Sequence, residues 1–395
     1  MDTYRDDIAE LRELTGMIKS PTSMQALARH RWHVTAGCRV PDLADALQRM
    51  PEIRVVAVLD GGDRYLGMVE RSALFAMLGK PFGRDVLKRS LVSELMVRTP
   101  CIDRDVSVFD LPPDPGSVGA RSPDAAFLAL QDHDARFAGL VEREDIARFL
   151  AEMTRNDIEL AARLQERLEA SSGLSDESAC RVSVFSSPAQ GVGGDFHFCR
   201  NLPDGRVFAT LCDVSGKGVS AAIIVTLAWG ILKAFDYRQG MRKLIKLLNS
   251  AIVETFHMER YLTGVFLIHD SARKRTVIAD MGHSHVSLLR GGRCLPLRSG
   301  QANLPVGLDP RLEPRLFSVT LRPGDRLVMH SDGITEQTDA DGREFGEERL
   351  MALLRSRHDK GIDSILEAIQ AESIRFRGPI RQQDDMSCMI ISFDE

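Results

Sequence analysis

The sequence predicts an α+β protein in which two β-sheets pack face to face between outer helices, preceded by a smaller α/β domain and a helical connector. Three observations support this prediction. A segment within the first 150 residues occurs twice, residues 146–168 contain neither glycine nor proline, and beyond residue 178 apolar strand-like runs alternate with helical stretches and turn signals. We therefore expect domains over residues 1–150 and 178–395, joined by a connector over 146–172.

Composition narrows the function classes. The 395 residues are 44% hydrophobic and 27% charged, as in globular proteins of two or three domains. A net charge of −5 gives no electrostatic reason to expect nucleic acid as a partner. The seven scattered cysteines form no CxxC pair, which argues against a disulfide framework or a zinc site and favours a reduced, cytoplasmic protein. We expect no signal peptide, because "MDTYRDDIAE" has no basic region followed by an apolar one. We expect no membrane partner, because the longest apolar stretch, residues 219–232, is shorter than the roughly 20 residues of a membrane helix.

The repeat lies in the first domain. Residues 55–78 align without a gap with residues 127–150, and the alignment matches Gly67 with Gly139. In each copy an apolar run, a polar turn, a second apolar run and an amphipathic stretch follow one another, which predicts strand, turn, strand and helix. Two such half-buried units are expected to pack into one pseudo-symmetric domain.

This arrangement resembles a tandem CBS (Bateman) module over about residues 20–150. The first copy has "VPDLADALQRM" (40–50) as the helix before its strands. The second has "DLPPDPGSVGARSPD" (110–124) in that place, where prolines and glycines break a helix. The resemblance implies an adenine nucleotide in the cleft between copies. The alternative is a degenerate module that serves only as a dimerisation scaffold.

The connector has one apolar stripe. Its apolar residues recur at helical spacing, and they are Leu150, Met153, Leu160, Leu164 and Leu168. We expect one helix that either pairs with its copy in a homodimer or serves as a plain linker. Residues 169–178, rich in serine, mark the boundary to the next domain.

The second half of the chain alternates between strand and helix signals. Strands are predicted within residues 206–214, 261–270, 275–282 and 325–333, and the second and third of these form a hairpin. Helices are predicted over residues 217–235, 240–257, 346–357 and 362–378. "GVGGDFHF" and "DVSGKGVS" are expected to be the arms of a further hairpin that turns at "NLPDG".

Four aspartates stand at strand ends beside glycines or small residues: Asp195, Asp213, Asp332 and Asp384. Each alone is most simply a turn former or helix cap. Together they indicate a metal site, because a buried strand-end carboxylate is unfavourable unless it is paired or binds a cation. Oxygen ligands suit Mg²⁺ or Mn²⁺, and two such ions about 3.5–4 Å apart activate a shared water.

The motifs "GGD", "DVSGKG", "SDG" and "DDMS", in this order, resemble the PPM-type (protein phosphatase 2C-like) enzymes and, among them, the bacterial stage II sporulation E-type phosphatases. The resemblance covers about residues 180–393. It implies an α–β–β–α sandwich and metal-dependent hydrolysis of phosphoserine or phosphothreonine on a protein. It further implies that the substrate is an anti-sigma-factor antagonist of the STAS type and that the N-terminal module regulates the reaction.

The resemblance also assigns roles to residues. Asp213 bridges two Mn²⁺ or Mg²⁺ ions, and the carbonyl of Val214 ligates one of them. Asp332 and Asp384 hold one ion, and Asp195 holds the other directly or through water. Asp213 and Asp195 are thereby the catalytic pair. Asp385 is the alternative to its neighbour Asp384.

Other residues near these motifs allow two interpretations. Lys217 either holds the phosphate or is a solvated cap lysine. For His283 and His285, a surface or turn position is favoured over a catalytic role. His197 is a weak candidate for a metal ligand. Phe198 stands where related enzymes often have an aspartate, so we expect altered metal affinity or substrate fit.

Two other functions compete with the phosphatase. A pseudophosphatase that senses a nucleotide and signals by contact is favoured by Phe198 and by the degenerate second repeat. It is disfavoured by the retained aspartates. A metal-dependent nuclease or polymerase is disfavoured by the missing basic surface.

Overall fold

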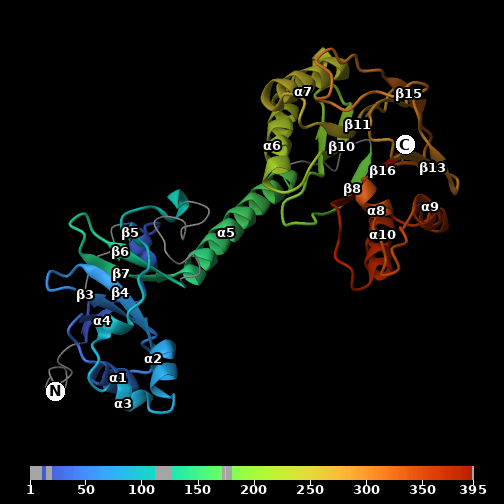
Figure 1. Cartoon of the computed structure of the whole chain (residues 1–395). Coiled ribbons are helices and arrows are strands. Elements are labelled where there is room, and N and C mark those ends of the chain that lie inside the picture. Colours follow the sequence, from blue (N-terminus) through green and yellow to red (C-terminus); the bar gives the residue numbers. More distant parts are fainter. Residues whose placement is uncertain (1–10, 15–19, 112–125, 171–173, 175–179, 394–395) are drawn as a thin grey trace, which may run out of the picture. The chain divides into compact units, whose positions relative to one another are not determined.

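The structure is a computed structural model that describes residues 11–14, 20–111, 126–170, 174 and 180–393 (Figure 1). It divides into two compact units, Met1–Thr154 and Arg155–Glu395. Within the described residues, no helix is both long and apolar enough to cross a bilayer.

In the first unit both copies of the repeat fold in the predicted order. The first copy consists of β3 (Val55–Leu59), β4 (Tyr65–Glu70) and α2 (Arg71–Leu78), and the second of β6 (Phe127–Gln131), β7 (Phe137–Glu142) and the start of α5 (Arg143–Ala170). Each hairpin has a register shift at the same place, between Val58 and Leu59 in one copy and between Leu130 and Gln131 in the other. The repeated sequence therefore produces repeated backbone geometry.

Further short elements complete this unit: β1 (Arg12–Glu13), η1 (Met24–Leu27), β2 (Trp32–Thr35), α1 (Val40–Arg49), α3 (Gly83–Leu87), α4 (Val92–Leu95), β5 (Cys101–Asp103) and η2 (Val108–Asp110). The sheets have the orders β1-β2-β3-β4 and β5-β6-β7. Where α1 precedes the strands of the first copy, the described part of the second copy has the 3-10 turn η2. The proline-containing segment 112–125 lies outside the described residues.

The two copies share a hydrophobic cluster. Val55, Ala57, Leu59 and Met68 of the first copy pack with the following residues of the second: Phe127, Ala129, Phe137 and Leu140. An antiparallel bridge between Arg64 and Arg136 joins the two turns. Each half therefore buries its apolar surface against the other, as a half-buried repeat requires.

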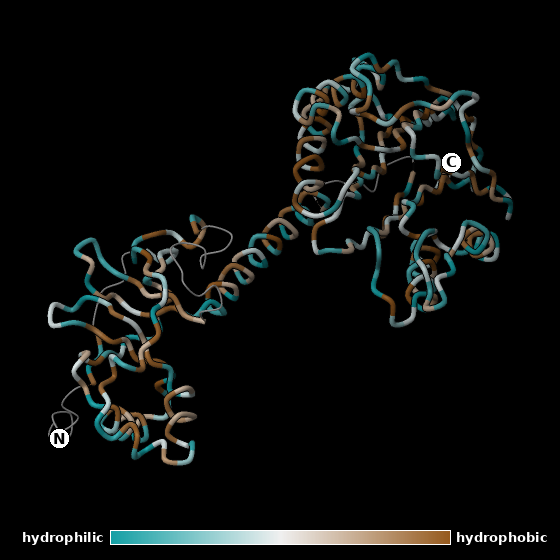
Figure 2. Tube along the Cα trace, in the orientation of Figure 1, coloured by the Kyte–Doolittle hydropathy of each residue, from teal (hydrophilic) through white to brown (hydrophobic). Residues whose placement is uncertain are grey.

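Helix α5 contains the predicted stretch 146–168 and continues from the first unit into the second. Hydrophobic and hydrophilic residues alternate around it (Figure 2). Leu168 packs against the core of the second unit, while Leu160 and Leu164 are about half exposed.

The second unit contains two five-stranded antiparallel sheets. The first has the order β15-β12-β11-β10-β9 and consists of β9 (Phe196–Asn201), β10 (Val207–Val214), β11 (Leu262–Asp270), β12 (Arg275–Met281) and β15 (Phe317–Thr320). The second has the order β14-β13-β16-β17-β8 and consists of β8 (Arg181–Ser187), β13 (Val286–Arg290), β14 (Arg293–Pro296), β16 (Asp325–His330) and β17 (Met386–Phe393).

Helices cover the outer face of each sheet. The first sheet packs against α6 (Val219–Ala234) and α7 (Met241–Phe256), which are joined by η4 (Tyr237–Gln239). The second sheet packs against α9 (Glu347–Ser356) and α10 (Ile362–Arg377), and the short α8 (Asp332–Thr335) follows β16. A third cluster, which includes Leu211, Leu267, Leu327 and Ile391, fills the space between the sheets. The predicted α–β–β–α sandwich is thereby confirmed.

Candidate active site

The hairpin of β9 and β10 brings the first two aspartates to one end of its sheet. Asp195 directly precedes β9, and Asp213 is the penultimate residue of β10, one position beyond the pairing of Cys212 with Phe196. The backbone N–H of Val214 donates to the carbonyl of Gly194 at 3.2 Å. The hairpin predicted from "GGDFHF" and "DVSGKG" is therefore confirmed.

The other two aspartates come from the second sheet. Asp332 is the first residue of α8, directly after β16, and Asp384 lies just before β17. Since β16 and β17 are antiparallel, the end of one lies beside the start of the other. Gly333 makes this approach possible, because a Cβ atom there would fall inside the contact distance of the Asp385 carbonyl oxygen.

Asp385 joins the two sheets at this end. Its Oδ1 accepts the backbone N–H of Ala189 at 2.7 Å, and its Oδ2 accepts that of Gly194 at 2.6 Å. A Cβ atom on Gly193 would lie 2.9 Å from this same Oδ2, which explains a glycine there. Because both carboxylate oxygens of Asp385 accept backbone N–H groups, its role is to position the loop of Gly193, Gly194 and Asp195, here called the glycine loop.

Asp384 is more accessible and is paired with a lysine. Its side chain is 44% exposed, and its Oδ2 lies 2.9 Å from Lys217 Nζ. The same ammonium donates to the carbonyl of Gln383 at 2.6 Å. Lys217 is thus part of the site, where its charge neutralises one carboxylate.

The surroundings of Asp213 favour its protonated form. Burial, followed by the carboxylates of Asp332, Asp384 and Asp385, raises the pKa of Asp213 to about 7, while Lys217 opposes the shift. All these groups therefore lie within electrostatic reach of the Asp213 side chain.

Asp195 is the most buried member, with 3% of its surface exposed. Burial raises its pKa well above the usual range and Asp213 adds to the shift, while the hydroxyls of Ser331 and Ser387 oppose it. Its Oδ2 is buried and has no hydrogen-bond partner among the described residues. An unpartnered carboxylate oxygen among other carboxylates fits a hard divalent cation such as Mg²⁺ or Mn²⁺.

The backbone carbonyl of Val214 faces the glycine loop. A Cβ atom on Gly194 would lie 2.8 Å from this oxygen, so only glycine allows the two segments to approach this closely. The paired glycines of "GGD" are therefore required by packing at the end of the sheet.

His283 lies in the turn between β12 and β13, as one of the two interpretations has it, but it is buried and not at the surface. It is 5% exposed; its Nε2 donates to the carbonyl of His330 at 2.8 Å and its Nδ1 lies 3.3 Å from Thr263 Oγ1. Burial lowers the pKa of His283 to about 3, so the ring is neutral. It holds two strand ends together. His285, close by, makes a 3.0 Å contact with Glu347 instead.

His197 and Phe198 point to opposite faces of β9. Burial lowers the pKa of His197 to about 4, and its buried Nδ1 has no hydrogen-bond partner within the described chain. Phe198 packs edge-on against Trp229 with ring centroids 5.3 Å apart, in the core beneath α6. Its ring belongs to that core, and the expected effect of Phe198 on metal affinity or substrate fit stays a prediction.

Two contributors have no strong sequence signal. On α5, Gln165 donates to the carbonyls of Gly193 and Asp195 at 3.4 and 3.3 Å and accepts the N–H of Gly193 at 3.3 Å. Near α6, the Arg260 guanidinium lies against Gly216, where a Cβ atom would be 2.7 Å from its Nη1. Neither residue belongs to a motif, and each reaches the site only through the tertiary fold.

The comparisons with known proteins agree with this geometry. Residues 203–394 match the family described as Stage II sporulation protein E (SpoIIE). The chain is 22% identical over 244 residues to phosphoserine phosphatase RsbP of Bacillus subtilis, which covers 60% of this chain and 58% of that protein. It is 23% identical over 185 residues to phosphoserine phosphatase RsbU of Bacillus subtilis, which covers 46% of this chain and 54% of that protein.

Among solved structures, the SiaA-PP2C domain of Pseudomonas aeruginosa has the same fold, with a TM-score of 0.55 at 20% identity over 62% of this chain and 99% of that one. The chain spans about half the length of the curated relatives it matches. The family match and the shared fold confirm the resemblance drawn from the four aspartate motifs. Residues 203–394 therefore match the stage II sporulation protein E family model, and the second unit has the PP2C fold.

Proposed function

We propose that this chain is a metal-dependent protein phosphatase that hydrolyses phosphoserine or phosphothreonine on a signalling protein. The observation that carries the proposal is the unpartnered, buried Oδ2 of Asp195 beside the carboxylate of Asp213. The similarity to two phosphoserine phosphatases supports the same substrate class.

The residues that would hold two Mn²⁺ or Mg²⁺ ions are the side chains of Asp195, Asp213, Asp332 and Asp384 and the carbonyl of Val214. When bound, such ions neutralise phosphate charge and lower the pKa of a water molecule that attacks phosphorus. In this arrangement Asp213 is the central ligand, because Asp332 and Asp384 raise its pKa and Asp213 in turn raises that of Asp195.

The chain's own cations would bind the phosphoryl group. Lys217 presents an ammonium at the edge of the carboxylate cluster, and the first N–H groups of α6 follow two residues later. Arg260 adds a guanidinium beside Gly216, and such a group binds two phosphate oxygens at once. These residues orient the substrate over the aspartates.

The phosphatase is tested by phosphate release from a phosphorylated protein in the presence of Mn²⁺, with the full chain. We expect Asp213→Asn to lower turnover by about 10³-fold or more, since loss of a central electrostatic contributor costs that much. Asp341→Asn, which changes an aspartate 66% exposed on the surface, is the matched control and should leave turnover unchanged. Absence of turnover by the native chain at saturating Mn²⁺ on phosphoproteins and aryl phosphates would contradict the proposal.

We propose that the substrate is a phosphorylated anti-sigma-factor antagonist of the STAS type. The proposal rests on the resemblance of the four motifs to stage II sporulation E-type phosphatases. A panel of phosphorylated STAS proteins and unrelated phosphoproteins tests it through kcat/KM. Equal values across the panel would contradict the assignment and would leave the phosphatase itself standing.

We also propose that the N-terminal module regulates the phosphatase through α5. Gln165 on this helix binds both the N–H and the carbonyl of Gly193, and it donates to the carbonyl of Asp195 as well. Gly194 and Asp195 are themselves buried, so the loop they form has no room to move independently of these contacts. A change in the position of α5 would therefore move the loop that carries Asp195.

The regulatory contact is tested with Gln165→Ala in the full chain. We expect kcat to fall about 10-fold or more with little change in KM, because the variant loosens a ligand-bearing loop and leaves the phosphate-binding cations intact. Arg163→Ala, which alters a 58% exposed side chain on the same helix, is the control. Equal kcat in the two variants would contradict the proposed route of regulation.

We propose further that an adenine nucleotide binds the N-terminal module. A cavity of about 520 Å³ there is lined by Arg54, Glu70, Arg71, Ser72 and Phe75 at the first copy and by Phe127 of the second. Two arginines and two aromatic rings suit a phosphate and a base. Calorimetry with AMP and ATP on native chain and Arg54→Ala tests this, and absence of binding to the native chain would contradict it.

We propose a cytoplasmic homodimer that pairs through α5. Leu160 and Leu164 are 51% and 50% exposed on this helix, which supports pairing with a second copy. All seven cysteines are described and none forms a disulfide, which supports a reducing compartment. Light scattering of native chain and Leu164→Glu tests the dimer, and a native monomer at micromolar concentration would contradict it.

The alternative, a nucleotide-sensing pseudophosphatase, was favoured by Phe198 and by the degenerate second repeat. The position of Phe198 weakens the first of these arguments. Phe198 packs in the core beneath α6 and does not replace a group of the carboxylate cluster. Nucleotide binding by a chain that shows no turnover on any phosphorylated substrate would favour this alternative over the phosphatase.

A further inference from the structure

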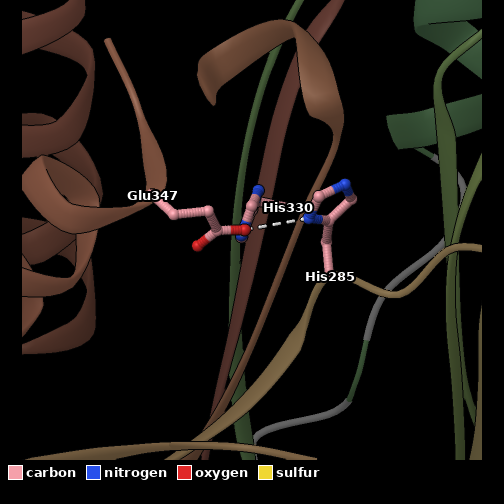
Figure 3. Close-up of side chains that lie close together, drawn as sticks. All are labelled: His285, His330 and Glu347. Atoms are coloured by element: carbon pink, nitrogen blue, oxygen red, sulfur yellow. Dashed lines mark hydrogen bonds and ion pairs between the residues drawn. The ribbon is translucent and has the colours of Figure 1, made fainter. Parts of the chain in front are cut away.

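A second cluster of side chains that can bind a metal lies on the second sheet of the second unit. His285 directly precedes β13, His330 ends β16 and Glu347 begins α9, so three separate segments meet (Figure 3). His285 Nδ1 lies 3.0 Å and His330 Nε2 3.6 Å from Glu347 Oε1. The imidazole centroids are 4.7 Å apart.

Hydrogen bonding fixes the tautomer of His330. Its Nδ1 lies 3.0 Å from the carbonyl oxygen of Ser331, which can only accept, so Nδ1 carries the hydrogen. In the neutral ring, Nε2 then presents a lone pair toward Glu347 Oε1, which is also an acceptor. With His330 only 2% exposed, little water can separate the two atoms. A cation between them removes this repulsion.

The spacing of the donor atoms suits a small transition-metal ion. Zinc–nitrogen and zinc–oxygen bonds of about 2.0–2.1 Å at tetrahedral angles place neighbouring ligand atoms roughly 3.3 Å apart. The two measured separations lie on either side of that value, and all three ligand atoms lie within 4.8 Å of one another. A carbonyl bond on the second ring nitrogen is also the usual support of a metal-binding histidine.

We propose that His285, His330 and Glu347 bind a first-row transition-metal ion of the Zn²⁺ type, separate from the proposed Mn²⁺ or Mg²⁺ pair. Two imidazoles and one carboxylate select Zn²⁺ or Co²⁺ over Mg²⁺, which prefers oxygen ligands. Three protein ligands leave one position open, and Glu347, 48% exposed, lies at the solvent side.

Such an ion would join the start of β13, the end of β16 and the start of α9. Asp332 follows His330 by two residues, so the site would also fix the strand end that carries a proposed ligand of the phosphatase. His285 and His330 belong to the sequence stretches "GHSHV" and "VMHSDG", which are far apart in the chain.

Co²⁺ binding to the full-length Asp213→Asn variant tests the proposal without depending on turnover. Asp213→Asn weakens the carboxylate cluster, so the visible absorption of Co²⁺ bound through imidazole reports on the histidine site. We expect one equivalent of Co²⁺, displaced by one equivalent of Zn²⁺. His285→Ala and Glu347→Gln should each weaken binding by more than about 100-fold, since even outer-shell partners are worth about 10–100-fold.

His358→Ala, which changes an exposed histidine outside the cluster, is the matched control and should leave the absorption unchanged. Glu347→Gln preserves the size of a half-exposed side chain, and circular dichroism verifies that it folds. The proposal is overturned if the parent chain shows no imidazole-type Co²⁺ absorption, or if folded His285→Ala and Glu347→Gln bind Co²⁺ as the parent does.

Discussion

Replacing Asp213 by asparagine should stabilise the metal-free protein at pH 8 and remove its stabilisation by Mn²⁺. Asparagine keeps the size of the side chain and removes its charge. In the folded chain the pKa of Asp213 rises from 3.8 to about 7, through burial and then through Asp332 and Asp384. At about 1.4 kcal/mol per pKa unit, the ionised carboxylate destabilises the metal-free fold by at most about 4 kcal/mol. Because neighbouring carboxylates share protons and water screens them, we expect a gain of about 1–4 kcal/mol.

The sign of the pH dependence follows from the raised pKa of Asp213. The unfolded chain loses this proton near pH 4 and the folded chain near pH 7, so between these values the stability of the native, metal-free protein falls as pH rises. The advantage of Asp213→Asn should therefore be largest above pH 7 and below about 2 kcal/mol at pH 5. Mn²⁺ should offset this advantage at pH 8 by about 2.7 kcal/mol at 100 Kd, because it stabilises the native protein alone.

Urea unfolding in a Trp32→Phe background measures these values. The chain has two tryptophans, so this background leaves Trp229, which is buried beneath α6 and reports on the second unit alone. Asp341→Asn is the surface control. The reasoning is refuted if Asp213→Asn is less stable than its parent in EDTA at pH 8, or if its effect is the same at pH 5 and pH 8.

Two further changes probe the packing and charge of the site. Gly333→Ala should lower the free energy of unfolding, measured in urea, by about 1–3 kcal/mol, because the new Cβ collides with the Asp385 carbonyl. Gly300→Ala is the control and should change this free energy little, because Gly300 has open space around it. Lys217→Met should tighten Mn²⁺ binding by up to about 5-fold in calorimetry, because a half-exposed ion pair worth at most about 1 kcal/mol no longer competes for Asp384. Weaker Mn²⁺ binding would show that Lys217 does not compete with the metal.

Long periodic elements could be predicted from the sequence. The stretches 217–235, 240–257 and 362–378 correspond to α6, α7 and α10 within a few residues at each end. Their apolar positions recur over several turns, so the signal adds up along the helix. Short strands such as β14 (Arg293–Pro296) and β15 (Phe317–Thr320) carry too few residues for such a signal, and pairing with a neighbouring strand alone defines them.

Strand parity explains where Phe198 lies. Phe198 and His197 are neighbours on β9, so their side chains face opposite sides of the sheet, and Phe198 faces the core beneath α6. A sequence motif does not show which face of the sheet a side chain takes. The same alternation separates Asp384 from Asp385, and the register of β17 decides that Asp385 binds the glycine loop while Asp384 stays accessible.

Sequence patterns predicted the repeated strand–turn–strand–helix unit, the continuous α5 and the four aspartates beside strands and small residues. These features are local, since periodicity and glycine positions act over a few residues. The tertiary fold alone leaves the Oδ2 of Asp195 without a hydrogen-bond partner among the described residues and brings His330 Nε2 to 3.6 Å from Glu347 Oε1. Such positions depend on contacts between separate segments of the chain, and no local pattern encodes the distances between them.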